Sequence, residues 1–248
     1  MTQRTAPTSG ARANDSDNSR VGVIIVAAGA SQRMMGRDLK PQDKIFEPLL
    51  GRPVISHTIS VFEECPLVYE IVLVLGQHNL EMGQALAAGE RWRKLKHVCL
   101  GGQRRQDSVK AGLQHISQCK WVMVHDGARP CVTQEIIRLG LEKVLETGAA
   151  VPAIAVNDTM KKVSADDTVQ ETLQREGLRV VQTPQVFHYD LLQEAYQEDP
   201  DGVTDDASLV ERQGHSVKVF TGSTENIKIT TQVDLHLAEA IFKSRANS

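Results

Sequence analysis

Short apolar runs recur along the chain, and longer segments with helical spacing of their apolar residues separate them. The runs lie at residues 21–28 (VGVIIVAA), 71–75 (IVLVL), 121–124 (WVMV) and 149–156. They are rich in aliphatic and β-branched side chains, which is typical of strands buried on both faces of a parallel sheet. We therefore predict four buried strands in this order.

The intervening segments have the spacing of amphipathic helices. Helices are predicted over residues 53–64, 80–86, 108–117 and 135–146. Pro53 suits a first helical turn, Asp107 or Ser108 is available to cap the third helix, and Gly148 ends the fourth.

This alternation of strands and helices predicts an α/β fold, with a Rossmann-like, mostly parallel sheet flanked by helices. No internal repeat or linker divides residues 21–243, so we expect one domain. Ligands of such sheets bind beyond the carboxyl ends of the strands. The loops after residues 21–28 and 121–124 are therefore the first places to look for a site.

Residues 157–180 break the alternation. Two polar segments, 159–163 and 168–173, flank the sequence Ser-Ala-Asp-Asp, which is a natural turn. They contain too little apolar surface for a core, so we predict a projecting β-hairpin arm, an element that often packs on a partner subunit. A surface loop without this pairing is the alternative.

Composition limits the classes of partner. The 248 residues are 41% hydrophobic but only 4% aromatic, so the core must consist mainly of Val, Ile, Leu and Ala. The formal net charge of −3 gives no global attraction to nucleic acid or to an anionic membrane, and we expect neither as a partner. Any phosphate site must then be a local cluster of Lys and Arg.

Cysteine usage and the N-terminal segment favour a cytoplasmic protein. The four cysteines have no CxxC spacing and no neighbouring His in a metal pattern, which favours reduced thiols. Residues 1–20 are polar and lack the apolar stretch of a secretory signal, so we predict a disordered tail. A transit peptide is the alternative, and Asp15 and Asp17 are unusual in one.

The loop after the first strand reads AAGASQRM over residues 27–34. Small side chains at Ala27, Ala28 and Gly29 allow backbone N–H groups to approach phosphate oxygens, and Arg33 adds a charge-assisted donor. The loop is neither a GxGxxG nor a Walker A sequence. By itself it fits equally well a tight strand-to-helix turn with a surface arginine.

An ordered series of motifs makes the signal specific. AAGASQRM is followed by Lys44, then by GGQRRQDSVKAGL (101–113), VHDGARP (124–130), DTMK (158–161), TPQ (183–185), TDDAS (204–208) and NIK (226–228). Over roughly residues 21–243, this series resembles the 2-C-methyl-D-erythritol 4-phosphate cytidylyltransferase branch of the sugar-nucleotidyltransferase superfamily. The resemblance implies an enzyme that transfers CMP from CTP to 2-C-methyl-D-erythritol 4-phosphate. It would release pyrophosphate and act in the non-mevalonate route to isoprenoid precursors.

The resemblance also implies roles for individual residues. The implied catalytic residues are Arg33, Lys44, Arg175 and Lys228; the nucleotide-binding residues are Ala27, Ala28, Gly29, Gly102, Ser108 and Asp126; and the substrate-binding residues are Arg129, Thr159, Lys161 and Thr183. Asp126 would also hold Mg²⁺ or another divalent cation against the triphosphate. Simpler interpretations stay open: Ser108 as a helix cap, Asp126 and Arg129 as a structural ion pair, and residues 204–208 as another cap.

For the arm, the resemblance implies that residues 157–180 reach across a homodimer. Each site would then borrow Thr159 and Arg175 from the neighbouring chain.

The chemistry explains why no catalytic base stands out. The second pKa of a phosphate monoester lies near 6, so the attacking oxygen is already ionised at neutral pH. Catalysis then requires positioning and charge neutralisation, which two cations near the α-phosphate together with a metal would supply. His125 is accordingly interpreted as a structural neighbour of Asp126.

Two departures from the family pattern affect these assignments. Asp43 precedes Lys44 where the family usually has Pro, and Lys40 lies in an unusually long segment before it, so Lys40 is an alternative to Lys44. Glu225 stands where an Asp often precedes the NIK triplet, which puts a metal role for this residue in doubt.

Three rival functions fit the series less well. A related enzyme that uses ribitol 5-phosphate would have a loop closer to AGGxGxRM. A non-catalytic nucleotide-binding relative should lack at least one charge among Arg33, Lys44, Asp126, Arg175 and Lys228, and all five are present. A nicotinamide-dependent dehydrogenase would need a fuller glycine fingerprint.

Overall fold

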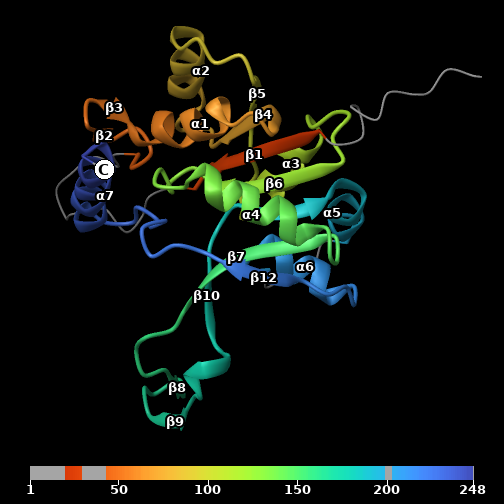
Figure 1. The fold of residues 1–248 in the computed structure, drawn as a ribbon, viewed down its shortest axis with the longest axis vertical. Helices are drawn as coiled ribbons and strands as arrows, with labels where there is room; N and C mark the ends of the chain where they lie inside the picture. Colours follow the sequence, from red (N-terminus) through yellow and green to blue (C-terminus); the bar gives the residue numbers. More distant parts are fainter. Residues whose placement is uncertain (1–19, 30–42, 199–202, 248) are drawn as a thin grey trace, which may run out of the picture.

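One twisted sheet organises the molecule (Figure 1). The computed structural model describes residues 20–29, 43–198 and 203–247. Within them, an eight-stranded sheet has the order β10-β7-β11-β6-β1-β4-β5, with β12 paired to β7. Its strands are β1 (Val21–Ala27), β4 (Val68–Leu75), β5 (Leu95–Leu100), β6 (Trp121–Asp126), β7 (Ala149–Ala155), β10 (Arg179–Val181), β11 (Gln185–His188) and β12 (Lys218–Thr221).

Most strand pairs are parallel, as the sequence predicts. β1 pairs in parallel with β4 and β6, β4 with β5, and β7 with β12. The exceptions are β11, which lies antiparallel between β6 and β7, and β10, which is antiparallel to β7. The predicted α/β fold is confirmed, and β5, β10, β11 and β12 are strands of this sheet that the sequence pattern did not indicate.

Seven helices of the described residues accompany the sheet. They are α1 (Val54–Glu64), α2 (Leu80–Gly89), α3 (Arg105–Leu113), α4 (Gln134–Val144), α5 (Tyr189–Ala195), α6 (Asp206–Arg212) and α7 (Gln232–Ala246). Each of the four predicted helices is present, with ends that differ from the predicted ones by at most four residues.

The prediction for α3 needs the largest correction. This helix begins at Arg105 rather than at Ser108, and Arg104 occupies the N-cap position. Asp107 acts from inside the first turn instead, where its Oδ2 accepts a hydrogen bond from the backbone N–H of Arg104 at 3.1 Å. The strand expected at residues 121–124 also continues to Asp126, because β1 pairs with it in parallel over this whole length and places Val26 opposite Asp126.

Apolar side chains of β1 point alternately to two helical layers. Val23 and Ile25 pack in a core that includes side chains of α1 and α4, whereas Ile24 packs in a core with α3, α5 and α6. A third, smaller core joins α7 to the start of α1 and to the short pair β2 (Pro48–Leu49) and β3 (Arg52–Pro53). The sheet is thus covered on both faces, and the edge where its parallel strands end is left for a site.

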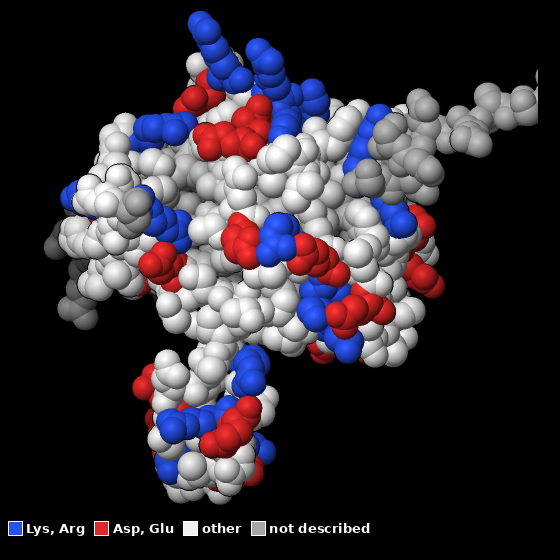
Figure 2. Space-filling model, viewed as in Figure 1, with Lys and Arg blue, Asp and Glu red and all other residues white. Residues whose placement is uncertain are grey.

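The predicted hairpin arm is present. β8 (Lys161–Val163) and β9 (Val169–Thr172) pair antiparallel, and the hairpin extends away from the sheet beyond β7 and β10 (Figure 1). Every residue of both strands is exposed. Basic and acidic side chains are intermixed over the arm (Figure 2). The arm's role in dimerisation stays a prediction.

Two further expectations from the sequence concern disulfide bonds and a membrane partner. All four cysteines are free of disulfide bonds, as expected. None of the helices in the described part of the chain is long and apolar enough to cross a membrane. The predicted tail, apart from Arg20, lies outside the described residues.

A core substitution in β11 should test its place between the two layers. Phe187 is completely buried, so Phe187→Ala is expected to lower the free energy of unfolding by about 3–5 kcal/mol, because it removes packing and leaves a cavity. Urea denaturation would measure the loss, with Leu145→Ala as the exposed control. Equal stability of the two variants would contradict this packing.

Candidate active site

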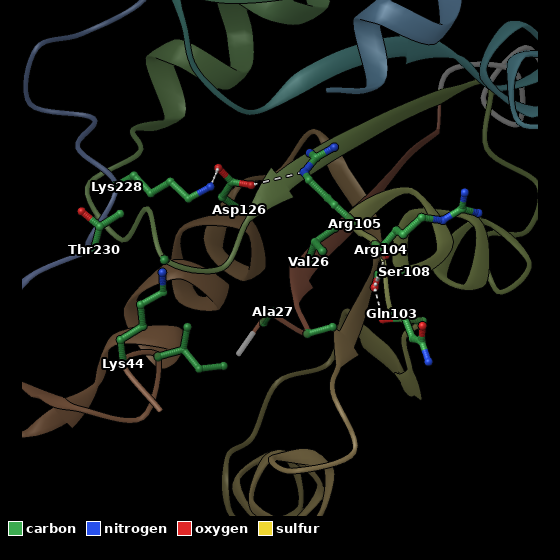
Figure 3. A pocket seen from close by; sticks show the side chains of 15 residues that line it. Val26, Ala27, Lys44, Gln103, Arg104, Arg105, Ser108, Asp126, Lys228 and Thr230 are labelled. Carbon is green, nitrogen blue, oxygen red and sulfur yellow. Dashed lines mark hydrogen bonds and ion pairs between the residues drawn. The ribbon is translucent and has the colours of Figure 1, made fainter. Parts of the chain in front are cut away.

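A cleft opens where β1 and β6 end (Figure 3). Its volume is about 250 Å³, and it lies at the edge of the sheet where the sequence predicts a site. Of the residues with predicted roles, Ala27, Ala28, Gly29, Lys44, Gly102, Ser108, Asp126 and Lys228 line it. Separate parts of the chain therefore meet here, although they lie far apart in the sequence.

One wall consists of the loop before α3 and the first turn of that helix. Gly101 is fixed to the sheet because its N–H donates to the carbonyl of Leu75 at 2.7 Å. A Cβ atom at Gly102 would lie 2.3 Å from the Cβ of Asp107, so only glycine lets this loop fold so tightly against α3. Backbone groups of the loop are thereby exposed to the cleft.

Ser108 is part of this wall, and it is not the N-cap of α3. Its hydroxyl lies 3.2 Å from the carbonyl oxygen of Arg104 and 3.4 Å from that of Gly102, so it donates its hydrogen to the backbone. The Ser108 oxygen keeps acceptor capacity toward the cleft, which it lines.

On the opposite wall, Asn79 fastens the segment that carries Lys44. The Asn79 side chain donates hydrogen bonds to the carbonyl of Ala27, at 3.1 Å, and to the carboxylate of Asp43. Asp43 also lies 3.2 Å from Nε2 of His78. The Asp that replaces the family's usual Pro is therefore used to tie this segment to the end of β1. Lys44 extends into the cleft from there (Figure 3).

Asp126 is the electrostatic centre of the site. Its Oδ2 lies 2.9 Å from Nζ of Lys228 and 3.3 Å from Nε of Arg129, and its Oδ1 lies 3.7 Å from Nε of Arg105. Burial alone would raise the pKa of Asp126, but the three cations prevail and hold it well below its ordinary value. Asp126 is thus ionised throughout the neutral pH range.

Cations outnumber the carboxylates in this cluster. Arg105 also pairs with Asp206, whose Oδ2 lies 2.8 Å from its Nη2. Three cations thus face two carboxylates, and Lys44 adds a further positive charge from the opposite wall. A cleft with this surplus suits a polyphosphate, whose oxygens carry several negative charges.

Thr183 and His125 support Asp126 from behind. Oγ1 of Thr183 accepts a hydrogen bond from the backbone N–H of Asp126 at 3.0 Å and lies 3.1 Å from Nδ1 of His125. Nε2 of His125 lies 3.1 Å from the carbonyl of Arg129, so this nitrogen carries the hydrogen. Burial lowers the pKa of His125 to about 4. A ring that stays neutral and has both nitrogens engaged agrees with the structural interpretation of His125.

The side chain of Arg129 is likewise held by contacts with other residues of the protein. Besides its contact with Asp126, its Nη1 donates to the carbonyl of Asn226 at 2.7 Å, and Nδ2 of Asn226 donates to the carbonyl of Thr183 at 2.9 Å. These bonds tie the loop that carries Lys228 to the end of β6. The structural ion pair of Asp126 and Arg129 is present, and neither Arg129 nor Thr183 lines the cleft.

The arm residues lie away from the cleft of their own chain. Nζ of Lys161 donates to Oγ1 of Thr172 at 2.6 Å, and Arg175 donates to the carbonyl of Asn157 at 2.5 Å. Thr159, Lys161 and Arg175 do not line the cleft. Two other predicted positions, Arg33 and the alternative lysine Lys40, lie outside the described residues.

The structure adds residues that the sequence interpretation left without a role. Arg105 and Thr230 line the cleft, and Asp206 holds Arg105 from below. Arg105 matches the arginine of the GGxxRxDS pattern, so a signal for it was present. Nothing in the sequence could pair it with Asp206, which lies 101 positions further along.

The donor set fits a divalent cation only together with a bound ligand. No cluster of three His, Cys, Asp or Glu side chains occurs in residues 20–29, 43–198 and 203–247. Among these residues, Asp126 is the one carboxylate that lines the cleft, and Mg²⁺ is commonly held by one or two carboxylates plus substrate phosphates. Glu225, whose metal role the sequence put in doubt, pairs with Arg245 at 2.8 Å.

Comparisons with known proteins agree with the geometry. Residues 21–244 match the family model described as 2-C-methyl-D-erythritol 4-phosphate cytidylyltransferase. Proteins of that name from Dehalococcoides mccartyi strain CBDB1 and Alkaliphilus oremlandii are 46% and 44% identical over 226 and 232 residues. These alignments cover 91% and 92% of this chain and 97% of each relative.

Solved structures agree as well. The crystal structure of 4-diphosphocytidyl-2C-methyl-D-erythritol synthase from Anaerococcus prevotii has a TM-score of 0.77 and 27% identity, covering 92% of this chain and 99% of that one. The 2-C-methyl-D-erythritol 4-phosphate cytidylyltransferase of Thermus thermophilus has a TM-score of 0.69 and 32% identity, covering 90% and 98%.

Removal of the central carboxylate should destabilise the protein. Asp126→Asn leaves Arg105, Arg129 and Lys228 without their shared counter-charge, so we expect a loss of about 3 kcal/mol at pH 7. Added pyrophosphate should restore more stability to this variant than to the wild type. Urea denaturation would measure both effects, with Asp190→Asn, whose side chain is 82% exposed, as control. A variant as stable as the wild type would disprove the central role of Asp126.

Proposed function

The chain belongs to the 2-C-methyl-D-erythritol 4-phosphate cytidylyltransferase family, and we propose that it transfers CMP from CTP to 2-C-methyl-D-erythritol 4-phosphate. The products are 4-diphosphocytidyl-2-C-methyl-D-erythritol and pyrophosphate, which places the enzyme in the non-mevalonate isoprenoid pathway. The observation that carries the proposal is the cleft in which Lys44 faces the cluster of Arg105, Asp126 and Lys228.

The cleft provides one wall for the base and another for the phosphates. Backbone groups near Gly102 and the Ser108 oxygen are suited to hydrogen bonding with the cytosine edge, and both positions line the cleft. Ala27, Ala28 and Gly29 at the end of β1 present small side chains where the triphosphate would lie.

Charge neutralisation at the α-phosphate is the main catalytic effect. Lys44 and Lys228 both line the cleft and would stabilise the charge that develops on the phosphoryl oxygens during in-line displacement. Arg33 is proposed as a third cation from its position in the motif. When Mg²⁺ is bound, Asp126 would hold it against the triphosphate, and the metal would supply further charge neutralisation.

The substrate phosphate acts as its own nucleophile. Its second pKa lies near 6, so an ionised oxygen is available without a base. The pKa of His125, lowered to about 4 by burial, agrees with this mechanism because a side chain enclosed in this way has no access to the substrate. The protein's task is to align the phosphate with the α-phosphorus.

We further propose that the arm completes the site of a partner copy in a homodimer. Thr159, Lys161 and Arg175 would bind the substrate phosphate there, and their distance from the cleft of their own chain supports this arrangement. Exposed Val163 and Val169 on the arm provide apolar surface for such contact. Residues 21–243 would form one nucleotidyltransferase domain, with residues 157–180 as its dimerisation arm.

The contacts of Arg129 and Thr183 favour support over direct substrate binding. Both side chains are engaged with the backbone or with Asp126, and Thr183 is buried. We propose that they fix the orientation of Asp126 and the loop of Lys228.

The four free cysteines fit a reducing compartment, so we assign the enzyme to the cytoplasm, without a nucleic acid or membrane partner.

Pyrophosphate release tests the reaction directly. With Mg²⁺, we expect release from CTP and 2-C-methyl-D-erythritol 4-phosphate together, and not from ATP, GTP or UTP or without the acceptor. Lys44→Ala should abolish most turnover, with Lys143→Ala on α4 as its control. Release with ribitol 5-phosphate in place of the methylerythritol substrate would support cytidylyl transfer but assign a different acceptor to the enzyme. No release with either acceptor would refute the proposal.

Mixed dimers test the role of the arm. Arg175→Ala and Lys228→Ala homodimers should each be inactive, whereas co-expression should restore roughly a quarter of the wild-type rate. Half of the randomly assembled dimers are then mixed, and each has one complete site of two. Arg175→Ala mixed with Thr159→Ala is the control, because neither chain then offers an intact arm. An inactive first mixture would show that the site does not cross between chains.

A further inference from the structure

Arg105 is shared between two carboxylates. Its Nη2 lies 2.8 Å from Oδ2 of Asp206, whereas its Nε lies 3.7 Å from Oδ1 of Asp126. The guanidinium is therefore drawn toward Asp206 and away from the carboxylate at the centre of the cleft. Burial opposes the charged form of Arg105, but Asp206 and Asp126 raise its pKa above the ordinary value. Arg105 is thus a permanent cation.

Asp206 is itself firmly held. It is completely buried, and the hydroxyl of Tyr196 donates a hydrogen bond to its Oδ1. One oxygen of Asp206 therefore faces Tyr196 and the other faces Arg105. A buried carboxylate is costly without partners; here Oδ1 accepts the hydrogen bond of Tyr196, and Oδ2 depends on its ion pair with Arg105.

The backbone around Asp206 is fixed to the sheet. The amide of Gln185 in β11 donates to Oδ2 of Asp205 at 2.7 Å, and its oxygen accepts from the N–H of Ala207 at 3.0 Å. Asp205 caps α6 by accepting from the N–H of Ser208. β11 pairs with β6, and β6 ends at Asp126. The two carboxylates that share Arg105 are therefore held by neighbouring strands: Asp126 by β6 itself, and Asp206 by the bonds of its neighbours to Gln185 in β11.

We infer that Asp206 is a positioning residue for cytidylyl transfer, which holds Arg105 at the cleft in the orientation that receives the nucleotide phosphates. Tyr196 fixes the carboxylate of Asp206. Without Asp206, Arg105 is free to move onto Asp126 and occupy the oxygen that faces the cleft. The inference rests on the proposed function and gives the TDDAS motif a role beyond the cap of α6, because Asp206 of this motif pairs with Arg105.

A double-mutant cycle tests whether Asp206 acts through Arg105. Asp206→Asn keeps the shape of the side chain and removes its charge, and we expect CTP binding about tenfold weaker by calorimetry. Arg105→Gln should weaken binding by at least as much. The double variant should then be no worse than Arg105→Gln alone, because the interaction has already been lost.

Asp205→Asn is the matched control. It makes the same chemical change one residue earlier, retains a residue type that caps helices well, and alters a side chain that does not pair with Arg105. We expect CTP affinity within about twofold of the wild type. If Asp205→Asn weakens CTP binding as much as Asp206→Asn does, the effect belongs to α6 as a whole and the inference is overturned.

A second readout is independent of CTP. In ¹⁵N-labelled protein, the Nε–Hε signal of Arg105, identified by its loss in Arg105→Gln, should be sharp and slow to exchange in the wild type and in Asp205→Asn. In Asp206→Asn it should shift and broaden. An unchanged signal in Asp206→Asn would overturn the inference. If the wild type neither binds CTP nor transfers CMP, the proposed function fails, while this spectrum still decides whether Asp206 holds Arg105.

Tyr196→Phe covers the case in which Asp206→Asn does not fold. This variant leaves the carboxylate in place and removes only its phenolic donor, so a smaller loss of CTP affinity in the same direction is expected. That loss should also disappear in the Arg105→Gln background. Losses from Tyr196→Phe and Arg105→Gln that simply add would contradict the inference.

Discussion

One ionised carboxylate, Asp126, determines the arrangement of the cleft. It ends β6 and lies within 4 Å of Arg105 at the start of α3, of Arg129 in the loop that directly follows β6, and of Lys228 in the segment before α7. These three cations would repel one another without it, and no other carboxylate of the described residues lines the cleft. The surrounding hydrogen bonds, in particular the one that the backbone N–H of Asp126 donates to Oγ1 of Thr183, keep that charge in place.

The fold stabilises this group of charged side chains because the residues that hold it lie on adjacent strands of the sheet. β1, β6 and β11 are adjacent, so the end of β6 is flanked by the glycine-containing loop on one side and by Thr183, just before β11, on the other. Apolar layers on both faces fix these strands. Because the strands are fixed in this way, a few hydrogen bonds are enough to hold the side chains at their ends.

Sequence patterns predicted the parts of this arrangement that depend on local rules. Buried parallel strands, amphipathic helices and the hairpin are local patterns, and the motif series placed eight residues that line the cleft. The pairing of Arg105 with Asp206 was missed because it depends on where the fold places the first residues of α3 and α6, which no periodicity records. The start of α3 was missed because Arg104, an uncommon cap residue, occupies the N-cap position.

Separation of the arm from its own cleft follows from the same constraint. Of the cations that line the cleft, Arg105 and Lys228 pair with Asp126, and Lys44 is proposed to bind the nucleotide phosphates, so the acceptor phosphate, which is also an anion, needs cations of its own. Arg175 and Lys161 are basic residues that lie elsewhere in the same chain, on an exposed hairpin. A second copy that brings them to the open side of the cleft would supply this charge without adding to the repulsion that Asp126 must balance within one chain.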